Sequence, residues 1–246
     1  MPVSPKFRVA AVNYLNAKPL LWGLERQPVA AQIEWHNNYP ARVADDLREG
    51  RADIALMPVA AMKTIPDSYV VGQYGIAAHG NVVSVALFSN VPMDQIQTVY
   101  LDYQSRTSVR LAELLLRNYW KQDVELLPAP EDYISRISGT TAGVIIGDRA
   151  LAQLSRFTHI YDLSRAWQAW QGVPFVFAAW IATRPLPEAF VQAFDEAQEQ
   201  GLRDLEQVIA ENPFPPYSLH TYYTENIVYR IGPDERIGME RFLALL

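Results

Sequence analysis

The chain has 246 residues and a formal net charge of −6; half of its residues are hydrophobic and a fifth are charged. It contains no cysteine, which excludes disulfides, thiolate catalysis and cysteine-ligated zinc. The acidic balance argues against a nucleic-acid-binding surface, so an anionic ligand would have to meet positive charge held locally.

The start of the chain and its apolar runs bear on location. The first eight residues lack the apolar core of a signal peptide. No apolar run approaches the length of a membrane span. We therefore expect a cytoplasmic protein without a membrane partner.

The first third of the chain alternates predicted strands and helices. Apolar runs predict strands at 7–13, 33–35 and 52–57. Between them, Pro19 suits the first turn of a helix that ends near Leu24, and a second helix runs from Pro40 to Gly50. The order strand, helix, strand predicts a βαβ unit with parallel strands.

The rest of the chain continues this alternation and then becomes helical. Further strands are predicted at 82–88, 97–102, 124–127, 141–146 and 175–182. Helices are predicted at about 107–120 and from 147 to 154. Helical spacing of apolar residues then predicts one long amphipathic helix at 187–211 and two more helical segments at 218–230 and 234–245.

These elements form two blocks, so the predicted fold is α/β with two lobes and a ligand cleft between them. Lobe I would comprise 1–88 and 176–246, and lobe II would comprise 89–175, with two crossing hinge segments near 86–92 and 172–178. Ligands in such layouts lie at the carboxyl ends of strands and at helix N-termini. The loops after Asn13, Asp102 and Ile146 would therefore line the cleft.

The loop after Asp102 is rich in hydroxyl groups: Ser105, Arg106, Thr107 and Ser108 stand where a helix begins. Unpaired N–H groups and the helix dipole favour an anion there. Helix capping is the alternative interpretation, because serine and threonine are preferred caps. Three hydroxyls beside one arginine exceed what a cap needs, which keeps a carboxylate or phosphate site open.

Three other polar residues are candidates for the cleft, each with a structural alternative. Asn16 follows a predicted strand, where a turn residue is common, and Ser84 is the single polar residue of its strand. Asp148 could cap the helix that follows it. The four histidines show no metal-ligand spacing, so no metal site is expected, and no nucleophile-elbow, phosphate-loop or dinucleotide motif occurs.

Six segments, in this order, carry a resemblance to a known family: RVAAVNYLNAKPLLWGL (8–24), DIALMPVA (53–60), GNVVSVALFS (80–89), LDYQSRTSVRLAELLL (101–116), GVIIGDRAL (143–151) and WQGVPFVFAAW (170–180). Together they resemble the chorismate dehydratases of the futalosine route to menaquinone, the MqnA family of menaquinone biosynthetic enzymes. The resemblance implies a fold similar to type II periplasmic binding proteins. It also implies the dehydration of chorismate to 3-[(1-carboxyvinyl)oxy]benzoate.

The resemblance also assigns roles to the candidate residues. Asn16 and Ser84 would contact the reacting ring, and substrate binding would fall to Tyr14, the 105–108 loop and Asp148. No cofactor is implied, since aromatisation of the ring supplies much of the driving force. The proton acceptor is left open between a substrate carboxylate, Asp148 and His79. The alternative function is a carboxylate-binding protein of the same fold that performs no chemistry.

Overall fold

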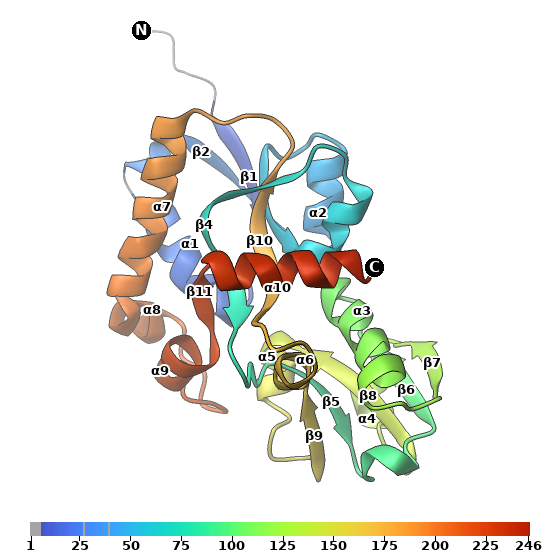
Figure 1. Cartoon of the computed structure of the whole chain (residues 1–246). Coiled ribbons are helices and arrows are strands. Elements are labelled where there is room, and N and C mark those ends of the chain that lie inside the picture. Colours follow the sequence, from blue (N-terminus) through green and yellow to red (C-terminus); the bar gives the residue numbers. More distant parts are fainter. Residues whose placement is uncertain (1–5, 27, 39) are drawn as a thin grey trace, which may run out of the picture.

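A computed structural model of the chain describes residues 6–26, 28–38 and 40–246. Its strands form two separate sheets with helices packed around them (Figure 1). We call the six-stranded sheet and its helices lobe I, and the five-stranded sheet and its helices lobe II. The predicted α/β class and the two-lobe layout are confirmed. Residues 1–5 lie outside the described residues. They are part of the N-terminal segment in which the sequence shows no signal-peptide core.

Lobe I is built on a mixed sheet in the order β11-β4-β10-β3-β1-β2. Its strands are β1 (Phe7–Ala11), β2 (Ile33–Asn37), β3 (Ile54–Pro58), β4 (Tyr69–Ala78), β10 (Phe175–Ala182) and β11 (Val228–Arg230). As predicted, β1 is parallel to β2 and β3, whereas β10 runs antiparallel between β3 and β4. The central strands β3 and β10 are almost wholly buried, which explains why both are continuous apolar runs.

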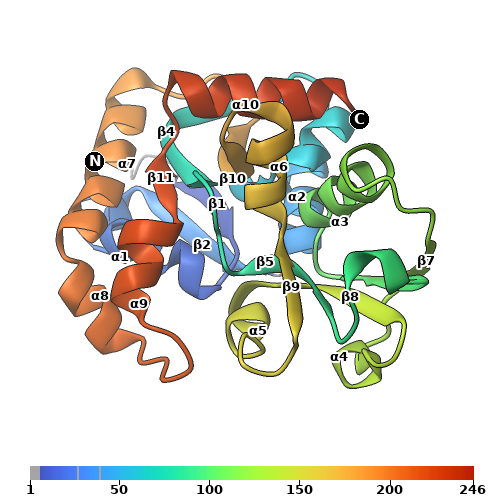
Figure 2. The same cartoon turned by 60° about the horizontal axis from the view of Figure 1, so that its bottom comes forward.

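Helices of lobe I cover both faces of this sheet. They are α1 (Lys18–Leu24), α2 (Pro40–Arg48), α7 (Glu188–Arg203), α8 (Leu205–Glu211), α9 (Leu219–Thr221) and α10 (Pro233–Ala244). Short 3₁₀ turns lie at Leu15–Ala17, Val29–Ala31 and Val59–Thr64, and a π-helical turn, Tyr222–Asn226, follows α9. Helix α10 crosses the sheet from β11 and contacts both β10 and the turn Val59–Thr64 (Figure 2).

Lobe II has the strand order β7-β6-β8-β5-β9. Its strands are β5 (Val85–Ser89), β6 (Thr98–Leu101), β7 (Glu125–Pro128), β8 (Thr141–Ile146) and β9 (His159–Asp162). Its helices are α3 (Thr107–Leu114), which continues as the π-helix Leu115–Tyr119, α4 (Tyr133–Arg136), α5 (Gly147–Leu151) and α6 (Leu163–Gln171), and a 3₁₀ turn lies at Met93–Gln95. β6 is parallel to β7 and β8, and β5 is antiparallel to β8 and β9.

The chain crosses between the lobes twice, in the segment 79–84 and again between α6 and β10, at 172–174. The segment 86–92, predicted as a hinge, begins inside β5, which pairs with β8 and β9 in lobe II. The first crossing therefore comes before the predicted segment 86–92. The apolar run at 82–88 contains both the end of the crossing and most of β5, so the run by itself does not mark where the crossing ends. The second crossing falls within the predicted segment 172–178.

Several elements differ from the sequence prediction. Strands β4 and β9 and helix α6 were not predicted; two glycines interrupt the apolar run of β4, and its pairing with β10 is irregular. The single helix expected at 187–211 is interrupted at Asp204, where φ is −98° and ψ is 32°. The segment 218–230, predicted as helical, ends in strand β11, because residues 228–230 pair with β4.

None of the helices in the described part of the chain is long and apolar enough to cross a membrane.

Candidate functional site

A cavity lies between the two lobes, with an empty volume of ≈ 560 Å³ that includes the space at its mouth. The three predicted loops line it: Tyr14 and Asn16 follow β1, Ser105, Thr107 and Ser108 follow β6, and Ile146 and Gly147 close β8. The rest of the wall is apolar apart from Ser84, and consists of Val12, Leu56, Pro58, Ile76, Val82, Val85, Phe177 and Ala178. The sequence prediction of which loops form the cleft is confirmed.

The described residues that line the cavity include none with a charged side chain. Polar groups of a ligand would meet hydroxyls, one amide side chain and the backbone at the start of α3. Apolar walls with a few placed polar groups are typical of small-molecule sites, in which the polar groups fix the orientation of the ligand. The cavity therefore suits a compact apolar ring that carries polar substituents.

Asn16 lies in the turn Leu15–Ala17, and its side-chain oxygen is buried without a hydrogen-bond partner. Leaving a buried polar atom unpaired costs about 1–3 kcal/mol. Because Asn16 lines the cavity, a ligand hydroxyl or N–H would supply the missing donor. Asn16 thus combines a place in the cavity wall with a buried, unpaired acceptor.

Ser84 is fully buried at the end of the first crossing, where its hydroxyl accepts a hydrogen bond from the Tyr222 hydroxyl at 2.7 Å. The residue before it, Val83, has φ of 56°, an unfavourable conformation for a β-branched side chain. Two contacts hold this strained segment: the N–H of Val83 donates to Asp162 at 2.7 Å, and the N–H of Gly147 donates to the Ser84 carbonyl at 2.7 Å. The fold therefore fixes Ser84 firmly in the cavity wall.

The hydroxyls of the 105–108 loop both stabilise the fold and line the cavity. Ser105 Oγ accepts from the N–H of Ser108 at 3.0 Å, which is a capping contact, and Thr107 Oγ1 accepts from the N–H of Ala60 in lobe I at 3.1 Å. In both contacts the hydroxyl is the acceptor, so its own proton is left to donate to a ligand. Capping and ligand contact, posed as alternatives from the sequence, are thus compatible here.

Arg106, predicted to bind the substrate, does not line this cavity. Its guanidinium pairs instead with Asp45 of α2 at 3.1 Å on the outer side of the loop, with about a third of its side chain exposed. The helix turn that aims Ser105 and Thr107 inward aims the intervening side chain outward. Arg106 thus links the two lobes at the surface.

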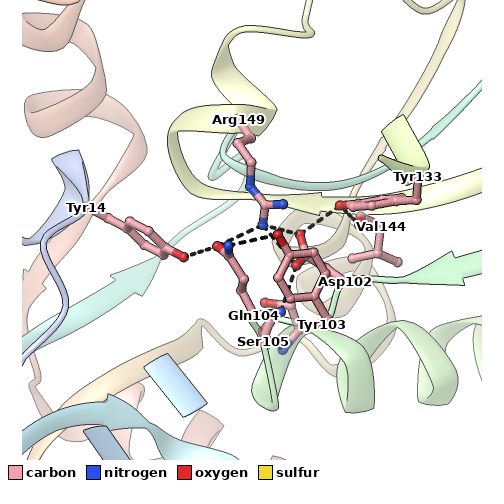
Figure 3. A network of polar contacts seen from close by, with 9 residues as sticks. Tyr14, Asp102, Tyr103, Gln104, Ser105, Tyr133, Val144 and Arg149 are labelled. Atoms are coloured by element: carbon pink, nitrogen blue, oxygen red, sulfur yellow. Dashed lines mark hydrogen bonds and ion pairs between the residues drawn. The ribbon is translucent and has the colours of Figure 1, made fainter. Parts of the chain in front are cut away.

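The Tyr14 ring lies beside Gly147, whose φ of 62° favours glycine; a Cβ there would be 3.4 Å from the ring, an ordinary van der Waals contact. Its hydroxyl donates to Gln104 of lobe II, as Figure 3 shows. Burial raises the pKa of Tyr14 to about 12, so the hydroxyl stays protonated at neutral pH. Tyr14 is therefore both a wall of the cavity and a contact between the lobes.

A buried ion pair beneath this contact was missed by the sequence analysis. Arg149 donates to both carboxylate oxygens of Asp102, at 2.7 and 2.9 Å, and to Gln104 at 3.0 Å (Figure 3). The Tyr133 hydroxyl donates to the same carboxylate at 2.8 Å, and Asp102 is only 1% exposed. The network fixes the position of Gln104 and hence of Tyr14. No local spacing could reveal it, since the paired residues are 47 positions apart.

Asp148 and His79, the two protein candidates for the base, do not line the cavity. Asp148 does not make the predicted cap; its carboxylate accepts from the N–H of Leu15 at 3.0 Å, and burial raises its pKa. The His79 ring pairs with Glu235 of α10 at 2.5 Å. Both side chains are thus engaged with other residues of the protein.

Among the described residues, polar contacts join the lobes around the cavity, so the structure shows a closed cleft. Each contact connects a residue of lobe I with one of lobe II: Tyr14 with Gln104, Leu15 with Asp148, Ala60 with Thr107, and Asp45 with Arg106.

Comparisons with known proteins agree on a family and a fold. A family model described as menaquinone biosynthesis matches residues 7–246. A chorismate dehydratase of Thermus thermophilus is 31% identical over 204 residues, which are 70% of this chain and 71% of the relative. One of Campylobacter jejuni is 25% identical over 240 residues, 94% of each chain. The periplasmic aliphatic sulphonate binding protein of Escherichia coli superposes with a TM-score of 0.64 at 17% identity, covering 98% of this chain and 87% of that one. The expected periplasmic-binding-protein-like fold is thereby confirmed.

Proposed function

This chain belongs to the menaquinone biosynthesis family, and from that membership we propose that it is a chorismate dehydratase, a lyase. In the proposed reaction, chorismate loses its ring C3 proton and its C4 hydroxyl as water. The product is 3-[(1-carboxyvinyl)oxy]benzoate. The family match along nearly the whole chain and the two dehydratase relatives support this reaction over binding alone.

The observation on which the assignment to this cavity rests is the unpaired oxygen of Asn16, a residue in the wall of the cavity. Chorismate carries one hydroxyl, at C4, on a six-membered ring. A hydrogen bond from this hydroxyl to Asn16 would fix the leaving group and satisfy the buried acceptor. Ser84 would then act on the same oxygen as a hydrogen-bond donor.

A substrate carboxylate would be held at the start of α3. Ser105, Thr107 and Ser108 supply hydroxyl protons there, and the helix dipole favours a negative charge. Tyr14 would close the binding site from the opposite lobe. Arg106 and Asp148 would contribute indirectly, by holding the lobes together.

The second carboxylate of chorismate is our proposed proton acceptor. No carboxylate or imidazole of the described residues lines the cavity, and Asp148 and His79 are both engaged elsewhere. The protein would then accelerate the reaction by orientation, by exclusion of water and by stabilising the departing oxygen. Chorismate would enter when the lobes open about 79–84 and 172–174. A cytoplasmic location is also part of this proposal.

Incubation of the purified protein with chorismate tests the function. We expect an aromatic product that is lighter than chorismate by one water, about 18 mass units. Its absorbance and mass spectrometry detect it. Saturable binding of chorismate without product would instead support the alternative, a carboxylate-binding protein of the same fold.

A further inference from the structure

We propose that Tyr222 is a positioning residue for the dehydration: it holds the Ser84 hydroxyl so that the serine proton points at the departing oxygen of the substrate. This inference rests on the function proposed above. It adds a residue from the C-terminal part of the chain, where the sequence analysis found no site residue.

Tyr222 reaches Ser84 from the π-helical turn Tyr222–Asn226, 138 positions away in sequence. The two hydroxyl oxygens are 2.7 Å apart, and both residues are 0% exposed. The Tyr217 ring packs edge-on against that of Tyr222 with centroids 6.3 Å apart, so the phenol has little freedom to turn away. Among the described residues, Tyr222 is the hydrogen-bond partner of the Ser84 hydroxyl, and no other side chain or backbone group bonds to it.

The direction of this hydrogen bond determines what Ser84 presents to the ligand. A hydroxyl has one proton, and burial raises the pKa of Tyr222 well above its usual value, so the phenol remains protonated. When Tyr222 donates its proton to Ser84 Oγ, the serine proton must seek another acceptor. Ser84 lines the cavity, and the ligand provides that acceptor.

The arrangement gives complementary partners to one substrate hydroxyl. Asn16 accepts its proton, and Ser84 donates to its oxygen. Two hydroxyls in series polarise one another, so the bond from Tyr222 strengthens the donation by Ser84. Such strengthening matters most when negative charge develops on the oxygen as the C4–O bond breaks.

The reaction balances without consuming either hydroxyl. The C3–H electron pair becomes the new ring double bond, and the C3 proton passes to the substrate carboxylate. The C4–O pair leaves with the oxygen, which takes up that proton and departs as water. Ser84 and Tyr222 end the cycle protonated as they began.

A neighbouring residue offers a matched control. Tyr229 is also buried, but its hydroxyl has no hydrogen-bond partner in the described structure. Tyr222→Phe and Tyr229→Phe therefore each remove one buried hydroxyl, and only the first breaks a contact with the cavity wall.

The test is steady-state turnover of chorismate by the wild type, Tyr222→Phe, Tyr229→Phe, Ser84→Ala and the double variant Ser84→Ala/Tyr222→Phe. We expect Tyr222→Phe to lower kcat at least about tenfold, with KM changed less than about threefold, because the lost interaction acts in the transition state. Tyr229→Phe should match the wild type. In the Ser84→Ala background, Tyr222→Phe should have no further effect on kcat.

Two results would overturn the role of Tyr222 and leave the proposed function standing. One is an equal kcat for Tyr222→Phe and Tyr229→Phe. The other is the same fall in kcat from Tyr222→Phe with Ser84 present and with Ser84→Ala, which would indicate a structural role. Absence of turnover by the wild type would overturn the proposed function and this assignment together.

Discussion

At the scale of single residues, several polar side chains of the cavity are hydrogen-bonded to the protein, whereas the buried oxygen of Asn16 is not. Ser84, Ser105 and Thr107 each accept a hydrogen bond from the protein, whereas the Asn16 oxygen has no partner. Proteins rarely bury an unpaired acceptor, because its lost hydration is not compensated. The unpaired oxygen of Asn16 belongs to a residue in the wall of the cavity where the substrate is expected.

Replacing Asn16 therefore separates function from stability. We expect Asn16→Ala to lower kcat/KM for chorismate about 100-fold, as for the loss of a transition-state contact. Thermal stability should be unchanged or higher, because the unpaired acceptor is removed. Asn13→Ala is the control, since the Asn13 oxygen accepts from Lys18 at the surface of the same loop. A large fall in the melting temperature of Asn16→Ala would indicate a structural role instead.

Asp148 provides a test by pH. Burial raises its folded-state pKa above the unfolded value of about 4, so the folded state binds more protons in the window between the two. Stability contributed by this residue is therefore lost as the pH rises through that window, and the loss is complete above it. Asparagine at position 148 does not ionise, so this pH-dependent loss of stability disappears. Its side-chain oxygen can still accept the hydrogen bond from the Leu15 N–H.

We expect Asp148→Asn to unfold at a higher urea concentration than the wild type at pH 7, with the difference shrinking below about pH 4. It should also retain most of its turnover, because a substrate carboxylate is the proposed base. Asp148→Ala, which removes the acceptor for Leu15 as well, should be less stable than Asp148→Asn. A kcat lowered by several orders of magnitude in a folded Asp148→Asn would identify Asp148 as the base.

At the scale of elements, helices α1 and α7 pack backbone against backbone through two glycines. A Cβ on Gly201 would lie 1.9 Å from the carbonyl oxygen of Pro19, and one on Gly23 would lie 1.6 Å from that of Ala197. Backbone cannot move aside as a side chain can. This contact places α1, and with it the turn that carries Asn16, on the sheet of lobe I.

Gly201→Ala should destabilise the protein by about 3 kcal/mol or more, at the upper end for overpacking. Chemical denaturation measures this against Glu199→Ala, an exposed position of the same helix that should change stability by less than about 0.5 kcal/mol. Equal stability of the two variants would show that α1 and α7 can separate without penalty.

Elements with a local signal were predictable from the sequence, and those made by distant partners were not. Strand β8 has an uninterrupted apolar run and α2 an amphipathic one, so both were found. Strand β11 has three residues and exists because it pairs with β4. The same distinction applies to the site: Asn16 and Ser105 follow strands in sequence, whereas Tyr222 and Arg149 reach it only through the fold.

At the scale of the whole molecule, closure of the cleft depends on contacts between the lobes, some of them outside the cavity. Arg106 bridges to Asp45 across the lobes, whereas Arg110 pairs with Glu113 within its own helix. Exposed ion pairs contribute about 0.2–1 kcal/mol each. Breaking the ion pair between Arg106 and Asp45 should therefore shift the equilibrium between the closed and open forms of the cleft modestly.

We expect Arg106→Ala to raise KM for chorismate about two- to fivefold, the factor that corresponds to such a pair, with kcat nearly unchanged. Arg110→Ala should leave both constants as in the wild type. Steady-state kinetics at low and high salt measure the effect, which should fade as salt screens the pair. A fall in kcat/KM of more than about 100-fold for Arg106→Ala would instead place the guanidinium in contact with the substrate.

The strand order of lobe I also determines when each part of the molecule can assemble during synthesis on the ribosome. All the strands of lobe II lie in one continuous stretch, from β5 to β9. In lobe I, by contrast, β10 inserts between β3 and β4, which precede it in the chain by about a hundred residues. Until β10 emerges, β3 and β4 each present an unpaired edge of the kind that invites aggregation. The nascent chain therefore holds an incomplete lobe I while lobe II can already pair its strands, and the wall of the cavity is completed only after β10 has emerged.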